Sequence, residues 1–523
     1  MEQFTYKIGT DRQLFVDDYL VAETRRLKKT LHQPTKHPNN PLIVASDGEK
    51  SPKDDVHPYG IYFQGSILFD PEDELYKIWY GSYGRRYRYA FSSNGLEFKK
   101  PELDVFDTQQ PKNVVYLGAF PHEWIRDRYI TMQTVSVVLD GHCKSPEERF
   151  KLMCFQAASS RRPAMKGPNA TSVQTAEKTP DQIRQQVPSG CYTAVSADGL
   201  HWRPNRTAVM SKEDDPLMSD NITLNYDPLK NRFMAFTKRH IVRGDGTGDQ
   251  DTIQRARGIS FSEDFVHWTR PITILYADDQ DPRDMQIYRM NGWTYEGMYL
   301  GMIEAYHSSH TNPDKPLYRD VQLVSSRDCE HWFRSGNRQT FLPVGGPGTW
   351  DAYMLDTPSN GPFVKGDELW FYYGGRPKHH NYQPGYFMTD DRENAAIGLA
   401  VLRRDGYVSY DAGAEAGTLL TKPFTFEQGR ALHLNADARR GAIRVEVLTA
   451  EEDPKAELRM WGIKYGAAVK DFETETCQAL TQDQADHTLA WKNGEDISSL
   501  KGRLIALRFH MQQASLFSWW ITS

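Results

Sequence analysis

Five acidic residues stand where their side chains could carry out acid-base chemistry. Asp220, Asp284 and Asp351 each come just before a run that reads as the innermost strand of a repeated β unit, and Glu296 and Glu304 lie in the second strand of the unit that follows Asp284. Transfer of a glycosyl group to water needs two such carboxyl groups, one protonated to assist the leaving oxygen and one ionised to attack or to activate water. An aspartate at a strand start can also cap a turn, and a strand glutamate can simply be exposed. The recurrence at equivalent positions favours a catalytic role.

Basic and aromatic residues accompany these acids and form the predicted binding set. Its members are His57, Tyr59, Arg239, His240, Arg283, His307, Trp350, Arg376, His379 and His380. Arginine and histidine donors suit sugar hydroxyls or a uronate, and aromatic rings stack on sugar faces. For each histidine the alternative is an ordinary loop residue. The adjacent pair His379 and His380 projects apart in an extended chain, so no metal is predicted, and no cofactor either.

A repeated turn organises the first four fifths of the chain. Four segments fit the pattern Ser-x-Asp/Asn-x-x-x-Trp/Phe, and Arg404–Tyr407 is a degenerate fifth copy; the four are Ser92–Phe98, Ser196–Trp202, Ser262–Trp268 and Ser326–Trp332. Two runs rich in β-branched and aromatic residues precede each turn. Such spacing is expected of four-stranded propeller blades with variable loops. We therefore predict an all-β protein with a five-bladed β-propeller over residues 1–421, whose inner strands converge on a central pocket.

The turn pattern stops after about residue 421. Four later runs alternate polar and apolar residues, as exposed antiparallel strands do: Leu432–Asn435, Ile443–Val447, Leu489–Trp491 and Leu504–Phe509. Residues 422–523 are thus predicted to form a β-sandwich.

Composition excludes several classes of partner. The net charge is −6, and the chain has no broad basic field of the kind that binds nucleic acid. Mean hydropathy is −0.66, and no apolar run approaches the ~20 residues that span a bilayer, so we expect no membrane partner. The five cysteines are scattered, without a metal or redox pair. Residues 1–5 carry no signal-peptide pattern, which leaves a cytoplasmic protein and the mature form of an exported one both open. Oligomeric state is open as well.

The order of elements resembles the five-bladed propellers of glycoside hydrolase families 32 and 43, and the trailing sandwich resembles family 32. A group of bacterial proteins described as family-32-like is more similar still, on the segments Leu14–Leu20, Leu31–Pro34 and Asn40–Leu42. The resemblance implies this architecture and a carbohydrate substrate. It departs at the family-32 nucleophile, an Asp in an Asn-Asp-Pro-Asn motif, because the matching run Ile61–Ser66 has no acid. Cys329-Glu330 reverses the family's Glu-Cys order, and Asp284 is followed by Met285 where the family has proline, so fructan specificity is unsupported.

These observations lead to two main hypotheses. The first is a glycoside hydrolase that acts on a poly- or oligosaccharide with acids from the third to fifth blades. The alternative is a non-catalytic glycan-binding propeller, which the missing first-blade acid and the many aromatic residues favour. A protein-binding scaffold ranks last, since it leaves the recurring acids unexplained.

Overall fold

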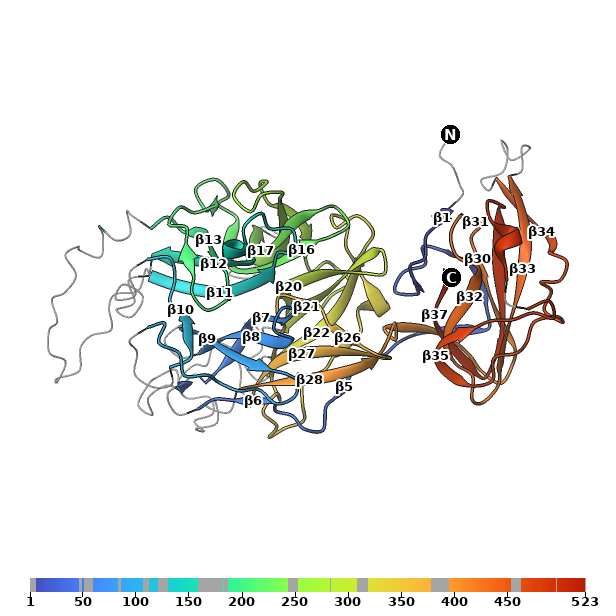
Figure 1. Ribbon diagram of the computed structural model, residues 1–523, viewed down its shortest axis with the longest axis horizontal. Coiled ribbons are helices and arrows are strands. Elements are labelled where there is room, and N and C mark those ends of the chain that lie inside the picture. The colour runs from blue at the N-terminus through green and yellow to red at the C-terminus, as the bar shows by residue number, and fades with distance from the viewer. Residues whose placement is uncertain are drawn as a thin grey trace.

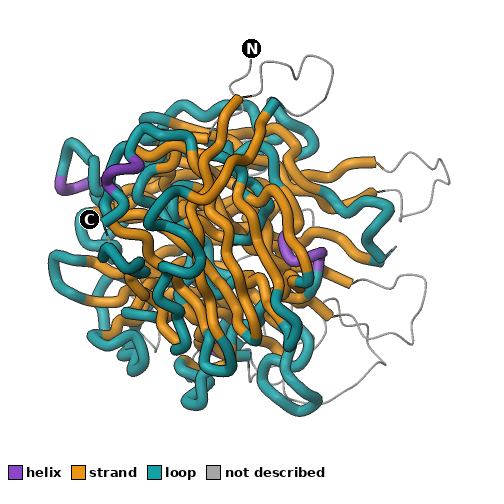
Figure 2. The backbone as a smooth tube through the Cα atoms, turned by 90° about the vertical axis from the view of Figure 1, so that its right-hand side faces the viewer, coloured by secondary structure: helices purple, strands orange, loops and turns teal. Residues whose placement is uncertain are grey.

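The protein is built almost entirely of β-strands (Figure 2). The computed structural model describes residues 6–46, 49–50, 60–82, 86–106, 112–120, 130–158, 182, 187–242, 253–282, 284–307, 318–377, 395–452, 462–494 and 496–522. Helical structure in these ranges is confined to short turns such as Pro146–Glu148. The predicted all-β class is confirmed. No helix of the described residues is long and apolar enough to cross a membrane.

Five antiparallel groups of strands, which we call sheets, form the larger part of the molecule (Figure 1), and the last two are linked into one 11-stranded sheet. The first sheet contains β7 (Tyr62–Asp70), β8 (Leu75–Ser82), β9 (Arg86–Ser92) and β10 (Val114–Tyr116), and the second β11 (Ile130–Leu139), β12 (Phe150–Ala158), β13 (Gly190–Ser196), β14 (Arg203–Pro204) and β15 (Met210–Ser211). The third contains β16 (Met218–Asp227), β17 (Arg232–Val242), β18 (Ile253–Ser262) and β19 (Ile272–Leu275). The fourth contains β20 (Met285–Tyr295), β21 (Met298–His307), β22 (Tyr318–Ser326), β23 (Phe333–Arg334) and β24 (Thr340–Leu342).

The fifth sheet combines the two ends of this region. It contains β25 (Met354–Asp356), β26 (Phe363–Lys365), β27 (Glu368–Arg376) and β28 (Ala396–Arg403), and its outer edge is supplied from far earlier in the chain by β5 (Thr35–Lys36) and β6 (Ile43–Val44). A single parallel bridge between Arg319 and Met354 links it to the fourth sheet. Its innermost strand consists of two parts, because β25 pairs with the end of β27 and β26 pairs with its start. The sequence predicted one run at residues 361–364.

The innermost segments of the five sheets are joined by hydrogen bonds in a closed circle. Each bond connects one sheet to the next: Val137 N to Ser66 Oγ (2.8 Å), Ile222 N to Thr134 Oγ1 (3.1 Å), Thr223 Oγ1 to Met290 O (2.6 Å), Asn291 Nδ2 to Pro358 O (2.8 Å) and Ser359 N to Gly65 O (2.8 Å). The last bond returns to the first sheet, so the sheets form a ring. We call this unit the ring.

The four predicted turns have one geometry. In the second copy the Ser196 hydroxyl accepts from Gly199 N at 2.9 Å, while Asp198 Oδ1 accepts from Leu200 N at 2.8 Å and His201 N at 2.9 Å. The other three copies make the same bonds. The motif thus has a local explanation, because its short polar side chains accept hydrogen bonds from backbone N–H groups two or three residues away. The degenerate copy differs, because Asp405 is buried.

Two further sheets lie at the right in Figure 1 and pack against each other. One contains β1 (Tyr6–Ile8), β3 (Val21–Arg25), β30 (Gly417–Thr421), β31 (Phe424–Phe426), β33 (Ala442–Glu452), β34 (Ile463–Ala468) and β36 (Ile505–Gln512), and the other β2 (Gln13–Leu14), β4 (Leu27–Leu31), β29 (Val408–Ala412), β32 (Ala431–Asp437), β35 (Asp483–Thr488) and β37 (Ala514–Thr522). Phe424 of the first sheet packs on Trp519 of the second, with ring centroids 5.3 Å apart. We call this unit the sandwich. It extends beyond the predicted 422–523, because β1–β4, β29 and β30 also pair within it.

A buried ion pair connects the ring to the sandwich. Arg12 Nη1 lies 2.8 Å from Asp405 Oδ2, and the Arg12 guanidinium carbon lies 3.6 Å from the ring centroid of Trp520. Tyr295 of β20 donates to the same aspartate at 2.6 Å. One apolar core continues from Phe371 in the ring to Trp519 in the sandwich. The fifth turn thus anchors the sandwich at one end of the ring.

Candidate functional site

A charged cluster lies at one end of the ring. At this end, the second strand of each sheet finishes and the third strand begins. Asp220 near the start of β16, Glu304 near the end of β21 and Arg376 at the end of β27 all belong to it. Antiparallel pairing places these chain positions at one end of their sheets, and the sandwich contacts the other end. The sequence predicted all three residues as site members.

Asp356 on β25 is the centre of this cluster. It receives a hydrogen bond from Nη2 of Arg319 and two from Arg376 Nη2 and Nε, at 2.8 and 3.1 Å. Gln64 Nε2 lies 3.4 Å away. Burial alone would raise the pKa of Asp356, but the charges of Arg376 and Arg319 outweigh it and hold the pKa well below its usual range. Asp356 is therefore an ionised group.

Glu304 contacts the Arg319 guanidinium through a different nitrogen from the one that binds Asp356. Its Oε1 accepts from Thr357 N at 2.7 Å and Thr357 Oγ1 at 3.1 Å, and Arg319 Nη1 lies 3.2 Å from its Oε2. The side chain is completely buried. Burial raises the pKa of Glu304, and the nearby negative charge of Asp356 raises it further, against the lowering effect of Arg319. One arginine thus holds two carboxyl groups whose proton affinities are pushed apart.

Asp220 is the more accessible acid of the cluster. Its side chain is 35% exposed and forms an ion pair with Lys238 of β17. Burial would raise the pKa of Asp220, but the charge and hydrogen bond of Lys238 lower it to about 2. His240 lies two residues further along the same strand face, and burial together with Lys238 and Arg255 lowers its pKa to about 4. Both Asp220 and His240 are therefore deprotonated at neutral pH.

Tyr288 connects Asp220 to the Asp356 side of the cluster. The Arg319 guanidinium carbon lies 4.4 Å from its ring centroid, and Lys238 Nζ lies 5.7 Å from it. The tyrosine is half-buried. Aromatic surface of this kind can support the apolar face of a sugar.

The predicted acid Asp351 lies apart from this cluster. A Cβ added to Gly374 would meet Phe63 and Asp356, whereas one added to Gly375 would meet Asp351 and Trp350. Neighbouring strand residues face opposite sides, so Asp351 and Asp356 lie on opposite faces of β27. Asp351 pairs instead with Lys36 at 2.6 Å, and Trp350 stacks on a core tyrosine.

The predicted acid Glu296 also lies apart from this cluster. Glu296 lies in the tight turn between β20 and β21, at the opposite end of the hairpin from His307. It accepts from Arg12 N at 3.0 Å and lies 3.6 Å from Arg404, next to the sandwich. Its role in the described contacts is to join the two units.

Three more predicted residues have their described interactions with residues that are not in the cluster. Arg239 faces away from Lys238 on β17 and is held by Asp215 and by the carbonyl of Pro271. His307 stacks on Tyr318, with ring centroids 4.3 Å apart, and Asp284 lies close enough to Tyr318 to affect its pKa. The remaining predictions, His57, Tyr59, Arg283, His379 and His380, lie outside the described residues. Within the described ranges, no three histidine, cysteine or acidic side chains are grouped as a metal site requires.

Sequence reasoning missed the cations that surround Tyr288 and the acid Asp356. Arg255 and Arg257 occupy alternate positions of β18, which puts both on one face, and this Arg-x-Arg spacing was a readable signal. Arg289 and Arg319 stand in the runs that form β20 and β22, which are buried along most of their length. A charge in such a run indicates a buried partner rather than an exposed face.

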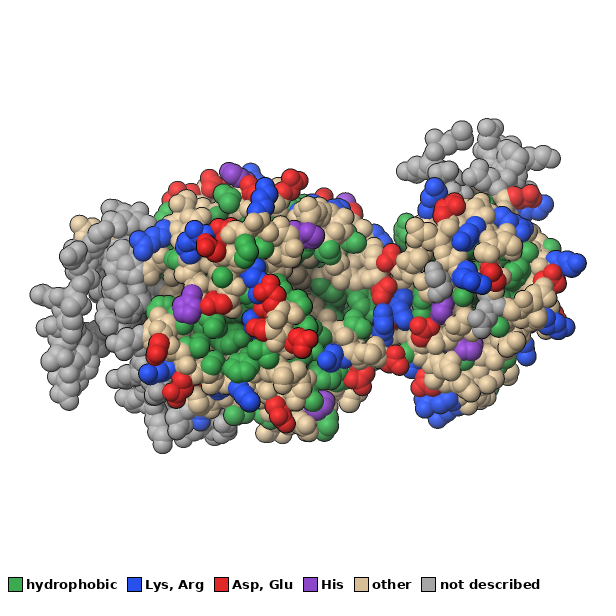
Figure 3. Space-filling model, viewed as in Figure 1, with side chains coloured by type: hydrophobic (Ala, Val, Ile, Leu, Met, Phe, Trp, Pro, Cys, Tyr) green, Lys and Arg blue, Asp and Glu red, His purple; other side chains and the backbone are tan. Residues whose placement is uncertain are grey.

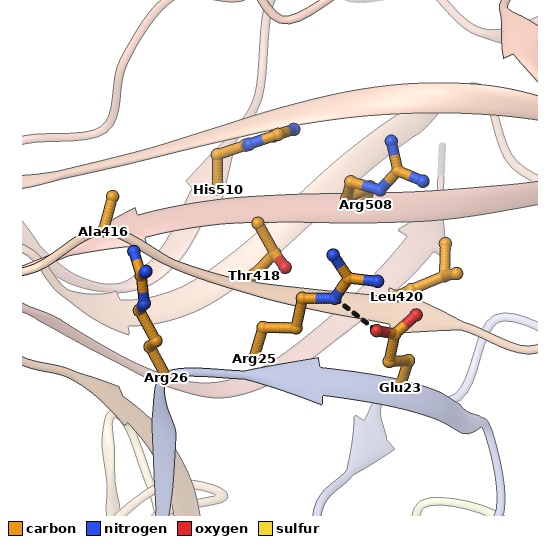
Figure 4. Close-up of a pocket in the computed structure, with 8 residues that line it drawn as sticks. All are labelled: Glu23, Arg25, Arg26, Ala416, Thr418, Leu420, Arg508 and His510. Carbon is orange, nitrogen blue, oxygen red and sulfur yellow. Dashed lines mark hydrogen bonds and ion pairs between the residues drawn. The ribbon is translucent and has the colours of Figure 1, made fainter.

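A groove on the sandwich is the other candidate site (Figure 4). It has a volume of about 490 Å³ and is lined by Glu23, Arg25, Arg26, Ala416, Thr418, Leu420, Arg508 and His510. Its cations already have partners, since Arg25 pairs with Glu23, and Arg508 and His510 share Glu446. Figure 3 likewise shows acidic and basic side chains interspersed over the visible face rather than gathered in a patch.

Comparisons with known proteins give distant similarity only. No family model matches the chain, and no curated protein matches it. Among solved structures, an N-acetylgalactosamine deacetylase from F. plautii in complex with blood group B trisaccharide is 14% identical, with 72% of this chain and 96% of that chain covered and a TM-score of 0.42. A glycosyl hydrolase from Bacteroides ovatus is 10% identical, with coverages of 75% and 96% and a TM-score of 0.42. A structure from the GH130 family of mannoside phosphorylases and glycoside hydrolases is 11% identical, with coverages of 72% and 94% and a TM-score of 0.43. At these values none of them assigns an activity to this chain.

Proposed function

We propose that this protein is a glycoside hydrolase that acts on a poly- or oligosaccharide, and that the ring is a five-bladed propeller with its site around Tyr288. The observation that carries the proposal is a pair of carboxyl groups in this cluster, Glu304 and Asp220, with opposite pKa shifts. Burial favours the protonated form of Glu304, and the charge and hydrogen bond of Lys238 favour the ionised form of Asp220. Carboxyl groups with opposed pKa shifts in one site are the requirement of glycosidic acid-base chemistry.

In the proposal, each acid of the cluster has a separate role. Glu304 is the general acid, and its proton goes to the glycosidic oxygen as the bond to the anomeric carbon breaks. Asp220 either attacks the anomeric carbon or takes a proton from the attacking water; the stereochemistry of the product distinguishes the two. Asp356 is a positioning residue that fixes Arg319 and Arg376. Tyr288 supports the sugar between the acids.

A non-catalytic glycan-binding protein is the second candidate, and one observation favours it. Glu304 and Asp356 are both 0% exposed in the described residues. Glu304 Oε1 and both oxygens of Asp356 are engaged by protein donors. A propeller with these contacts could hold a glycan on Tyr288 without reacting with it.

Sugar release from a glycan panel tests the choice. The hydrolase proposal expects release by the wild type and a loss of at least about a hundredfold in kcat for Asp220→Asn and Glu304→Gln, since a general acid or base contributes ~10²–10⁴-fold. Glu296→Gln is the matched control, because that glutamate is partly buried on the same hairpin but lies next to the sandwich. Glycan binding without release by the wild type would establish the second candidate. Full activity in both site variants would refute the proposed roles.

A further inference from the structure

The surroundings of Tyr288 carry more positive than negative charge. Six cationic side chains gather there against three carboxyl groups: Lys238, Arg255, Arg257, Arg289, Arg319 and Arg376 against Asp220, Glu304 and Asp356. Burial shifts Glu304 toward its neutral form, which acts in the same direction as this excess of positive charge. Buried like charges are costly unless an opposite charge lies nearby.

Several of these cations keep unused hydrogen-bond donors. Arg255 Nε, Arg257 Nε, and Arg289 Nε and Nη1 are buried atoms without a hydrogen-bond partner. Arg257, Arg289 and Arg319 are completely buried. Unpaired buried donors cost ~1–3 kcal/mol each, more when charged, so native sites normally satisfy them with a ligand, an ion or water.

The pKa shifts agree with this crowding. Burial, and then the charge of Arg289, lower the pKa of Arg257 to about 9. Burial lowers the pKa of Arg289 as well, and Arg319 adds to the effect. An anion bound beside them would relieve the mutual repulsion. The sandwich groove lacks this feature, since its arginines face their own carboxylates.

We infer that the substrate of the proposed site carries an anionic oxygen group, a carboxylate, sulfate or phosphate, that binds beside Tyr288 against Arg255 and Lys238. This inference rests on the proposed function and narrows its substrate class to acidic glycans or to a neutral glycan with a free oxyanion as co-substrate. Arg255 is the member best placed to meet a ligand. It is half-buried, and its guanidinium carbon lies 6.0 Å from the Tyr288 ring centroid and 5.4 Å from that of Tyr306. Its Nη1 donates to Gln286, and its Nε has no hydrogen-bond partner. Guanidinium groups bind planar and tetrahedral oxyanions through paired donors.

Calorimetric titration of the full chain with small probes tests the inference. The probes are inorganic phosphate, sulfate, glucuronate and galacturonate, with glucose as the neutral reference, all at low chloride. At least one anion is expected to bind saturably while glucose does not. Arg255→Gln should weaken that binding by at least about tenfold, because a hydrogen bond to a charged group contributes ~1.5–3 kcal/mol. Arg255→Lys should recover part of the affinity, since it restores the charge but not the planar donors.

Arg203→Gln is the matched control, because Arg203 also lies on a strand of the ring but is 69% exposed and paired with Glu148. The identity of the binding anion separates the sources: a uronate or sulfate indicates an acidic glycan, and phosphate alone indicates a free co-substrate. Equal anion binding by the wild type and Arg255→Gln would overturn the location. Absence of anion binding by a wild type that hydrolyses neutral glycans would overturn the inference and leave the proposed function standing. Anion binding without hydrolysis of any glycan would overturn the function and leave the anion site.

Discussion

Replacement of Asp356 by asparagine should destabilise the protein strongly at neutral pH. The substitution keeps the size of the side chain, so it makes no cavity, but it removes the counter-charge of Arg319 and Arg376. Arg319 is completely buried, whereas Arg376 retains 19% exposure and can be partly solvated. Loss of one partner of a buried ion pair costs ~3–5 kcal/mol. We expect about this loss, which is a large part of the ~5–15 kcal/mol that stabilises an ordinary domain.

Urea unfolding at pH 7, followed by intrinsic fluorescence, measures this change. A protein of two units need not unfold in one step, so the midpoint of the transition that responds to the substitution is compared with the same transition in the wild type. Asp437→Asn is the control. Asp437 pairs with Arg439 at 2.6 Å, but that arginine is 66% exposed, and the change should stay within about 0.5 kcal/mol.

Glu304→Gln supplies the contrast that can refute the reasoning. Glutamine resembles the protonated acid and can still accept from Thr357, so at pH 7 the loss should be below about 1 kcal/mol. The direction of the pH dependence follows from the raised pKa of Glu304. The folded state holds the proton more tightly than the unfolded state, so the wild type loses stability as pH rises above the unfolded pKa of about 4.5. The variant lacks this loss, so the difference in stability should shift in its favour as pH rises above about 4.5. A loss as large as that of Asp356→Asn would show that Glu304 is ionised.

Three further predictions concern the frame of the molecule. Asp328→Ala removes the acceptor of two turn N–H groups and should cost ~1 kcal/mol in urea unfolding, with Glu330→Ala in the same turn nearly neutral. Arg12→Met leaves Asp405 buried without its cation and should cost ~3–5 kcal/mol, seen as earlier unfolding or as separate transitions of the ring and the sandwich; an unchanged profile would mean that the ion pair does not couple them. Burial would raise the pKa of Asp70, but its contacts with Arg149 and Lys77 lower it to about 2. The stabilisation from ionised Asp70 is therefore complete above the unfolded value of 3.8 and is lost as pH falls toward 2. Asp70→Asn should make the stability of the protein less dependent on pH in this acid range.

The repeated turns were readable because their chemistry is local. Ser196 and Asp198 bond to backbone groups two or three residues away, so the sequence pattern specifies the geometry with no knowledge of the rest of the fold. The edge strands β5 and β6 were not readable in the same way. Their partner β28 lies about 360 residues later, and a two-residue strand carries no period of its own.

The site was predicted in part for a related reason. Asp220 and Glu304 stand in strands whose pairing is regular, so their end of the sheet follows from counting along the strand. Asp351 and Asp356 are both close in sequence to β25, and choosing between them requires the face of β27 that each one meets. Sequence position alone does not give that face.

The two glycines before Arg376 carried the missing information. A Cβ on Gly374 would lie 2.8 Å from the Cβ of Phe63 and 3.1 Å from that of Asp356, and a Cβ on Gly375 would lie 2.4 Å from that of Asp351. Glycine weakens a strand interior and is kept where another chain segment approaches closely. Consecutive glycines in β27 therefore indicate close approach on both faces, by Asp356 on the face of Gly374 and by Asp351 on the face of Gly375. Because Phe63 belongs to the first sheet, the acid that shares its face of β27 is the one that faces this neighbouring sheet, and that acid is Asp356, with Gln64 of β7 3.4 Å away.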